Sequence, residues 1–374
     1  MKSSYTCYAA CSFGLESCVK RELENCEGIR DVQSRDARVY FTADGEKGVA
    51  QACLRLSAAD RVYIVLKEFR AATFDELFEG VKSIRWSDWL SKTSCFPVNG
   101  DSVQSVLKSV PDIQAISKKA VVESLSEVYG VRFFKESGSK VGIYVNLLRD
   151  TVSVTVNPCG IGLNRRGYRV KNGPAPLRET LASGLIDISR WRDRPFYDPM
   201  CGSGTIAIEA ALRAVHRAPG LGRAFDAEDW GEDWKKAFDE ERENARSEVL
   251  SVPMAPVFAS DIDPKMVEMA RFHARRAGVS SGIVFKTADI RDFAAESENG
   301  TVICNPPYAI RMGEERETRE LYRAIGKTME KFGNLRQYYI CADERFESAF
   351  GRPADRKRKV YNGNIKCTYY QYFR

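Results

Sequence analysis

The chain has 374 residues, of which 44% are hydrophobic and 29% charged, and its formal net charge is +6. This composition is typical of an ordinary soluble protein with two or three domains. No run of about 18 apolar residues is present, and the first residues lack the apolar core of a signal peptide, so we expect no membrane span and no secretion.

Cysteine and histidine usage narrows the chemistry further. The eleven cysteines are odd in number and never spaced C-x-x-C, and only two histidines are present, so we expect no metal site. Reduced thiols fit a cytoplasmic location best. The mild positive charge permits an anionic partner without requiring one.

The first 157 residues mix helices with antiparallel hairpins, which predicts an α+β region. Helices are expected over residues 14–25, 47–56, 74–84 and 111–129. Strands are expected over residues 5–13, 32–42 (as one strand or a hairpin), 61–69, 131–134, 141–147 and 152–156. Thr73, with Glu76 three residues later, has the pattern of a capping box, and Gly130 is expected to end the long helix.

Residues 157–173 differ from what precedes them, because they contain four glycines and no acidic residue. One interpretation is a flexible, solvated linker. The other is a contact with an RNA backbone at the mouth of the next domain, since guanidinium groups suit phosphate. The basic residues concerned are Arg165, Arg166, Arg169 and Lys171.

From about residue 190, short apolar strands alternate with helices. Strands are expected over residues 195–197, 257–260, 283–286, 301–304 and 337–341, and helices over 206–215, 265–278 and 314–332. Residues 357–361 and 364–373 predict a terminal hairpin, with Asn362-Gly363 at its turn. This order predicts an α/β fold: a mostly parallel sheet with helices on both faces and one antiparallel strand.

A glycine turn, Asp198–Thr205, follows the first of these strands. Gly202 and Gly204 would let a ligand approach the backbone closely where a helix begins. Asp198, at the strand end, suits a cationic ligand better than a pyrophosphate. The alternative is a tight turn with a purely structural role.

Acidic residues follow the next two strands. Asp261 stands where such folds place an acceptor for both ribose hydroxyls, although it could instead cap the next helix, a role that Asp263 could equally take. A dinucleotide fingerprint places this acid about 20 residues after the glycines, and the long separation here disfavours NAD. Asp289 could accept a hydrogen bond from an adenine amino group, or be a solvated turn residue.

The most specific pattern is Asn305-Pro306-Pro307-Tyr308, which follows the strand over residues 301–304. Two successive prolines end the strand and restrict the backbone, so Asn305 is expected at its carboxyl end, where open α/β sheets bind ligands. The Asn305 oxygen and the Pro306 carbonyl could hold the amino group of a planar base on which Tyr308 stacks. The pattern favours methyl transfer from a methyl sulfonium to this amino group by positioning and charge placement.

Residues 190–374 therefore resemble the class I S-adenosylmethionine-dependent methyltransferases that act on amino groups. The resemblance rests on the glycine motif, the acidic motif Ala259–Pro264 and the catalytic motif, in that order. The whole chain resembles the THUMP-domain RNA guanine-N2-methyltransferases. The stretches that carry this closer match are Leu163–Arg169, Ala175–Ala182 and Ser109–Asp112.

The resemblance implies a ferredoxin-like segment (1–65), a THUMP RNA-binding domain (66–157), a basic linker with a helix covering the cofactor (158–189), and a methyltransferase domain (190–374). That domain is expected to have a Rossmann-like, mostly parallel seven-stranded sheet, and residues 176–182 are expected over the methionine end of the cofactor. The implied catalytic residues are Asn305, Pro306, Pro307 and Tyr308. The implied residues for S-adenosyl-L-methionine are Arg178, Glu179, Thr180, Asp198, Pro199, Gly202, Ser203, Gly204, Asp261, Ile262, Asp289, Ile290 and Asn305.

The resemblance thus implies a cytoplasmic enzyme that methylates N2 of a guanine, with 23S ribosomal RNA as the expected target. The alternatives are an adenine-N6 methyltransferase acting on DNA or RNA, a tRNA guanine-N2 methyltransferase, and an RNA-binding assembly factor with a vestigial cofactor pocket. The N-terminal region could instead serve dimerisation or structure alone, and the oligomeric state is left open. A second basic run is either an RNA-facing patch or a solvated strand edge; it comprises Arg356, Lys357, Arg358 and Lys359.

Overall fold

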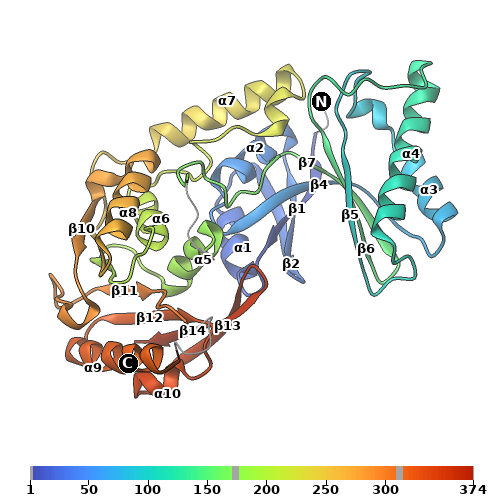
Figure 1. Cartoon of the computed structure of the whole chain (residues 1–374). Helices are drawn as coiled ribbons and strands as arrows, with labels where there is room; N and C mark the ends of the chain where they lie inside the picture. The colour runs from blue at the N-terminus through green and yellow to red at the C-terminus, as the bar shows by residue number, and fades with distance from the viewer. Residues whose placement is uncertain (1–2, 171–176, 309–314, 374) are drawn as a thin grey trace.

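The computed structural model describes residues 3–170, 177–308 and 315–373. Two seven-stranded sheets organise the chain, one in each half (Figure 1). The first has the strand order β2-β3-β1-β4-β7-β6-β5, and the second has the order β10-β9-β8-β11-β12-β14-β13. Among the described residues, no helix combines the length and the apolar character needed to cross a membrane.

The N-terminal half is a single continuous sheet with helices packed on it. Its strands are β1 (Tyr5–Cys11), β2 (Ile29–Arg35), β3 (Arg38–Ala43), β4 (Ala59–Arg70), β5 (Val98–Val103), β6 (Gly142–Leu148) and β7 (Thr151–Asn157). Its helices are α1 (Glu16–Glu24), α2 (Gly45–Arg55), α3 (Phe74–Lys82), the 3₁₀ turn η1 (Trp86–Asp88) and α4 (Val110–Tyr129). The long strand β4 pairs with β1 on one side and β7 on the other, so the boundary expected after residue 65 falls inside a strand that both segments share.

Local signals decide several helix ends in this half. The Thr73 hydroxyl accepts a hydrogen bond from the Glu76 backbone N–H at 3.2 Å, and the Glu76 carboxylate accepts from the Thr73 N–H at 3.0 Å, which confirms the capping box. Gly130 ends α4 with a left-handed φ of +67°.

The strand predicted over residues 131–134 is wrong. These residues form no strand, and Phe133 is 83% exposed. The sheet position beside β6 is taken by β5, which pairs with β6 in parallel. Because β5 contains Asn99, Gly100 and Asp101, which disfavour strands, its sequence did not predict it.

The C-terminal half confirms the predicted α/β fold. Its strands are β8 (Phe196–Asp198), β9 (Val257–Asp261), β10 (Ile283–Thr287), β11 (Thr301–Cys304), β12 (Arg336–Cys341), β13 (Arg356–Asn362) and β14 (Ile365–Tyr372). Its helices are α5 (Glu179–Ser189), α6 (Thr205–Ala214), α7 (Glu232–Ser247), α8 (Pro264–Ala277), α9 (Glu315–Met329) and α10 (Phe346–Phe350). Strands β8 to β12 are parallel, and β14 runs antiparallel between β12 and β13.

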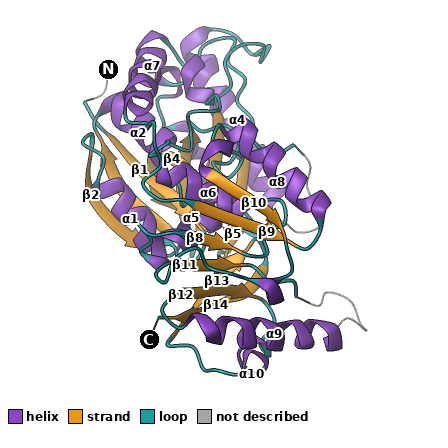
Figure 2. Ribbon diagram, turned by 90° about the vertical axis from the view of Figure 1, so that its left-hand side faces the viewer, coloured by secondary structure: helices purple, strands orange, loops and turns teal. Residues whose placement is uncertain are grey.

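Helices cover both faces of this second sheet (Figure 2). Neighbouring residues along β11 illustrate this, because Ile303 belongs to the larger buried cluster and Val302 to the smaller one, in which residues of α9 and α10 are packed. Both faces of the strand are therefore apolar, as buried parallel strands require.

Helix α7 was not predicted, because its sequence is strongly charged and lies within a long polar segment. It packs along α2 of the N-terminal half (Figure 1). Arg55 of α2 forms an ion pair with Glu241 and a bidentate pair with Glu248 at 2.6 and 2.8 Å, which fastens the two halves together.

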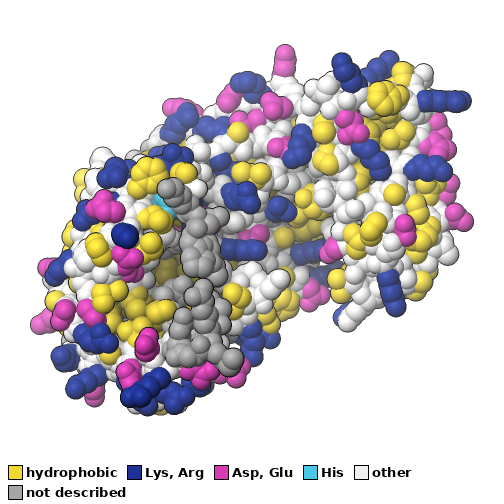
Figure 3. Space-filling model, viewed as in Figure 1, with side chains coloured by type: hydrophobic (Ala, Val, Ile, Leu, Met, Phe, Trp, Pro, Cys, Tyr) yellow, Lys and Arg dark blue, Asp and Glu magenta, His cyan; other side chains and the backbone are white. Residues whose placement is uncertain are grey.

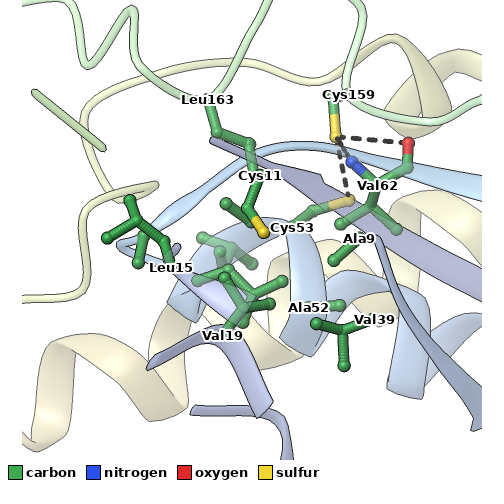
Figure 4. Packing of buried hydrophobic residues seen from close by; sticks show 14 of the residues in the cluster. Ala9, Cys11, Leu15, Val19, Val39, Ala52, Cys53, Val62, Cys159 and Leu163 are labelled. Carbon is green, nitrogen blue, oxygen red and sulfur yellow. Dashed lines mark hydrogen bonds between the residues drawn. The ribbon is translucent and has the colours of Figure 1, made fainter. Parts of the chain in front are cut away.

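The chain between the two sheets also packs on the N-terminal core (Figure 4). Cys159 lies against Cys53 of α2 with 3.7 Å between the sulfur atoms, and the Val62 N–H donates to its Sγ at 3.3 Å. Leu163 is buried in the same cluster. All eleven cysteines are free thiols.

Candidate active site

The predicted site residues converge because β8, β9, β10 and β11 are parallel and their carboxyl ends share one edge of the sheet. Asp198 ends β8, Asp261 ends β9, and Asn305 directly follows β11. Asp289 lies two residues beyond the end of β10.

Asp198 is buried, and no described residue supplies it with a counter-charge. Its side chain is 1% exposed, and neither carboxylate oxygen has a hydrogen-bond partner within normal distance among the described residues. Burial and the negative charge of Asp261 raise the pKa of Asp198 well above its usual range, and the backbone N–H groups of Ala207 and Met200 only partly oppose this. A cationic group bound here would supply the missing partner.

The glycine turn is open on one side and packed on the other. The Gly202 N–H donates to Asp261 Oδ2 at 2.9 Å, and a Cβ placed on Gly202 would meet no atom within 4 Å. Gly204, with φ of +88°, packs against α8 so closely that a Cβ would lie 2.8 Å from that of Ala270. The turn therefore leaves room for a ligand beside Gly202 while Gly204 holds it against the fold.

His273 supports the same turn, and sequence reasoning gave it no role. Its ring nitrogen Nδ1 lies 3.0 Å from the Ser203 carbonyl oxygen, and burial lowers the pKa of the imidazole. The neutral ring, held on α8, fixes the turn by donating this hydrogen bond. Pro199, the other predicted residue of this turn, is buried.

The alternative roles of the two aspartates after β9 are resolved by their contacts. Asp263 caps α8, since its carboxylate accepts from the Lys265 N–H at 2.8 Å. Asp261 instead accepts from Gly202 through one oxygen and from the Asp263 N–H through the other, at 3.0 Å. Between them, Ile262 is 65% exposed and presents an apolar side chain beside the turn.

Asp289 lies in a turn, which is one of the two alternatives that the sequence left open for it. Its carboxylate accepts from the Arg291 N–H at 2.8 Å and pairs with the Arg291 guanidinium at 2.7 Å. It caps the 3₁₀ turn η4 (Ile290–Asp292), and Ile290 is buried in the smaller hydrophobic cluster. A ligand amino group would have to share this carboxylate with Arg291.

The Asn-Pro-Pro-Tyr turn is held in place by a hydrogen bond from helix α9. The buried Tyr322 of α9 donates its hydroxyl proton to the Pro307 carbonyl oxygen at 3.0 Å, and the same hydroxyl lies 3.3 Å from the Cys341 sulfur. The Asn305 side chain is half-buried, and no described residue forms a hydrogen bond with its amide oxygen. Sequence reasoning missed Tyr322, which lies beyond the motif on the next helix.

Tyr308, the last residue of the turn, faces the terminal hairpin. It packs against the smaller cluster, and burial raises the pKa of its phenol, which the hydrogen-bonding side chain of Asn362 opposes. Asn362, at the end of β13, also accepts from the Arg178 backbone N–H at 3.3 Å. The terminal hairpin therefore contacts both the Asn-Pro-Pro-Tyr turn and the start of α5.

The first residues of α5 are engaged in contacts with the N-terminal half. The Thr180 hydroxyl donates to Asp60 of β4 at 2.6 Å, and the Arg178 guanidinium lies 3.7 Å from the same carboxylate. Glu179 is buried and pairs with Arg169 at 3.4 Å. These contacts join the modules; a role toward the cofactor stays a proposal for all three, and residues 175 and 176 lie outside the described part of the chain.

Over the described residues 157–170, the flexible, solvated linker is a wrong prediction, and so is an RNA contact for Arg166. The Arg166 side chain is only 3% exposed, with its guanidinium 3.4 Å from Glu209 of α6. Glu209 also accepts from Tyr168 at 3.0 Å and from Ser183 at 2.6 Å, so the segment is fastened by a buried polar network. Arg169 is also largely buried; Arg165 is exposed, and Lys171 lies outside the described residues.

The second basic run lies on the edge strand β13. Arg356, Lys357 and Lys359 are exposed, while Arg358 is half-buried and donates to the Gly14 carbonyl at 3.2 Å. Lysine and arginine side chains also occur over both halves of the molecule and in the hollow between them (Figure 3).

Comparison with known proteins assigns a family to each part. Residues 6–63 match the model described as RlmL ferredoxin-like domain, residues 71–157 match the THUMP domain, and residues 166–371 match the RMKL-like methyltransferase domain. The chain belongs to the RMKL-like methyltransferase family. It combines the methyltransferase domain with a THUMP domain, as the resemblance implied.

Relatives of this RMKL-like methyltransferase match it along its whole length. The Bacillus subtilis (strain 168) protein named "Putative RNA methyltransferase YpsC" is 41% identical over 99% of this chain and 96% of its own. A solved structure described as "SMU.472, a putative methyltransferase complexed with SAH" is 37% identical with a TM-score of 0.92, and the match covers 100% of this chain and 99% of that one. A Listeria monocytogenes (str. 4b F2365) structure, described as a predicted N6-adenine-specific DNA methylase, is 40% identical with a TM-score of 0.91. The match covers 99% of this chain and 96% of that one.

The cofactor of this methyltransferase is S-adenosylmethionine, as the family and the SAH complex of a full-length relative indicate. The residues at the sheet edge fit it. The unpartnered Asp198 suits its cationic methionine end, and the open side of Gly202 leaves room for its close approach. Asp261 and the exposed Ile262 are proposed to face its ribose and adenine.

Proposed function

We propose that this methyltransferase transfers a methyl group to the exocyclic N2 of a guanine in RNA, with 23S ribosomal RNA as the preferred substrate and the cytoplasm as the place of action. The observation that carries the proposal is the position of Asn305–Tyr308 at the carboxyl end of β11, on the same edge of the sheet as Asp198 at the end of β8 and Asp261 at the end of β9. A THUMP domain and the name of the Bacillus relative support RNA as the polymer. We retain the four-part domain division as part of the proposal.

The proposed chemistry needs the chain to hold an amino group and a planar base. S-adenosylmethionine, when bound, supplies the electrophilic methyl group. The Asn305 amide oxygen and the Pro306 carbonyl would accept the two amino protons, which favours the pyramidal, nucleophilic form of the nitrogen. The Pro307 carbonyl already accepts one hydrogen bond, from the Tyr322 hydroxyl. The amino proton released on transfer passes to solvent.

The base must leave its stack to reach this turn. Tyr308, which packs against the smaller cluster near Asn362, would stack on the base and fix its angle. Positioning of this kind, together with charge placement, supplies most of the rate acceleration that we propose.

A second candidate is methylation of adenine N6, because the same four residues can hold either amino group. The description of the Listeria relative favours it. The base and the polymer are tested together by incubating the protein with labelled S-adenosylmethionine and unmodified transcripts of 23S ribosomal RNA and tRNA. Digestion to nucleosides and mass spectrometry should give N2-methylguanosine from the 23S transcript. N6-methyladenosine would overturn the choice of base, and label in tRNA alone would overturn the choice of RNA.

A further inference from the structure

A cleft lined by basic side chains lies between the two halves of the molecule, away from the cofactor residues. It has a volume of about 280 Å³ and is bounded by α1, the end of α5 and the edge strand β13. Five of its lining residues are cationic and one, Asp187, is anionic. The cationic residues are Arg21, Arg190, Arg356, Lys357 and Arg358.

The charges in this cleft are only partly compensated. Arg21 pairs with Asp187, but Arg213 takes the other oxygen of that carboxylate at 3.0 Å. Lys357 pairs with Glu347 at 2.9 Å. Arg190 and Arg356 form no ion pair with any residue in the described part of the chain.

The backbone conformation of Arg190 also indicates that this residue has a role in the cleft. Arg190 ends α5 in the left-handed conformation, with φ of +54°, where glycine is the favoured residue. An arginine at this position costs conformational energy without returning an ion pair. A functional charge would explain its presence.

Strand β13 connects the cleft to the active site. It runs in the same direction as β11, so Asn362 at its end lies at the edge that holds Asn305, while Arg356 begins it at the cleft. Six residue steps at about 3.3 Å each separate the two ends by about 20 Å. Lys357 and Lys359 are exposed along the way, which makes the strand a positively charged path.

We propose that this cleft binds a backbone phosphate of the RNA substrate, about 20 Å along the strand from the methylated base. This inference rests on the proposed function, because it takes RNA as the substrate. At about 3.4 Å per stacked nucleotide, the phosphate would lie roughly six nucleotides from the target, and fewer in an extended strand. Because Arg21 comes from the N-terminal half and Arg356 from the C-terminal half, the bound strand would bridge the two halves.

The test replaces the two cations that lack an ion-pair partner among the described residues. The Arg190→Ala/Arg356→Ala variant removes two charges. It also removes the contact of the Arg356 guanidinium with the Phe373 ring, whose centroid lies 5.9 Å away. Its matched control is Lys235→Ala/Lys236→Ala on α7, where both side chains are exposed and form only local pairs. The RNA probe is the transcript that the wild-type protein methylates, and affinity is measured over a range of salt concentrations.

The cleft variant should bind this RNA several-fold more weakly, and its log–log salt slope should become shallower by about 0.7 for each phosphate that the protein no longer binds. Its affinity for S-adenosylmethionine should be unchanged, which excludes misfolding as the cause. The difference from wild type should disappear with RNA trimmed to three nucleotides on either side of the target. An unchanged salt slope in the variant, with RNA methylation by wild type intact, would overturn the cleft alone; failure of wild type to methylate any RNA would instead overturn the proposed function.

Discussion

The Tyr322 hydroxyl donates a hydrogen bond to the Pro307 carbonyl oxygen across 3.0 Å, which ties the Asn-Pro-Pro-Tyr turn to helix α9. Two prolines restrict the turn from within, but their rings cannot fix its distance from the rest of the sheet. Tyr322 does so from a buried position, with its ring in edge contact with Phe346 at 5.0 Å between centroids.

Replacing Tyr322 with phenylalanine should therefore impair catalysis more than stability. The ring packing survives in Tyr322→Phe, while the Pro307 carbonyl loses its donor, so the turn can shift. Because small misplacements of reacting groups cost up to about 100-fold in rate, we expect kcat to fall about tenfold. The KM for S-adenosylmethionine should change little, and the free energy of unfolding should fall by about 1 kcal/mol.

The control for this variant is Tyr372→Phe, whose buried hydroxyl also donates to a backbone carbonyl, that of Arg352 at 3.3 Å. This bond lies away from the turn. Equal losses of kcat in both variants would remove Tyr322 from any positioning role.

Asp198→Asn should stabilise the cofactor-free protein while weakening cofactor binding. The substitution removes a buried carboxylate that Asp261 repels, so at a pH where Asp198 is ionised we expect the free energy of unfolding to rise by about 1 kcal/mol. The same change removes the proposed partner of the cationic methionine end. Thermal unfolding and calorimetric titration check the two effects, and a less stable protein with full cofactor affinity would contradict both.

Because the pKa of Asp198 is raised, both the stability of the cofactor-free protein and its affinity for the cofactor should depend on pH. Between its ordinary pKa and the raised one, the folded protein binds more protons than the unfolded chain, so this group lowers the stability of the cofactor-free protein as pH rises through that window. Cofactor binding requires the ionised form, so affinity should fall up to tenfold per pH unit below the raised pKa. Titrations over the pH range in which the cofactor-free protein stays folded should show this slope in wild type and none in Asp198→Asn.

The adjacent residues Arg165 and Arg166 should differ in their contribution to stability, because only Arg166 is buried. Arg166→Ala should lower the free energy of unfolding by about 3–5 kcal/mol, because it leaves the buried Glu209 without its cation. Arg165 is exposed, so Arg165→Ala should stay within about 0.5 kcal/mol of wild type. Chemical denaturation measures both, and similar values for the two variants would show that the buried network contributes little.

The features that sequence predicted well are those set by local chemistry. The capping box at Thr73, the left-handed Gly130 and the terminal hairpin depend on residues within one turn of each other, although the hairpin turn falls on Gly363-Asn364, one residue later than predicted. The order of strand-end acids around Asp198 and Asp261 was also readable, because parallel strands must bring their carboxyl ends together.

The features that sequence missed depend on distant partners. The basic character of residues 163–169 indicated a solvated segment, yet Glu209, some 40 residues later, buries Arg166. Strand β5 owes its place to β6, and α7 to its ion pairs with α2, so neither is visible in local pattern. Tyr322 carries no motif of its own, and only its contact with Pro307 reveals it.

The central claim is that Asn305 holds the amino group that receives the methyl. Single-turnover methyl transfer to unmodified 23S transcript by Asn305→Ala, with cofactor affinity measured on the same preparation, tests it most directly. We expect transfer to fall by about 10²- to 10³-fold while the affinity for S-adenosylmethionine stays nearly unchanged. Transfer at the wild-type rate by Asn305→Ala would contradict the claim.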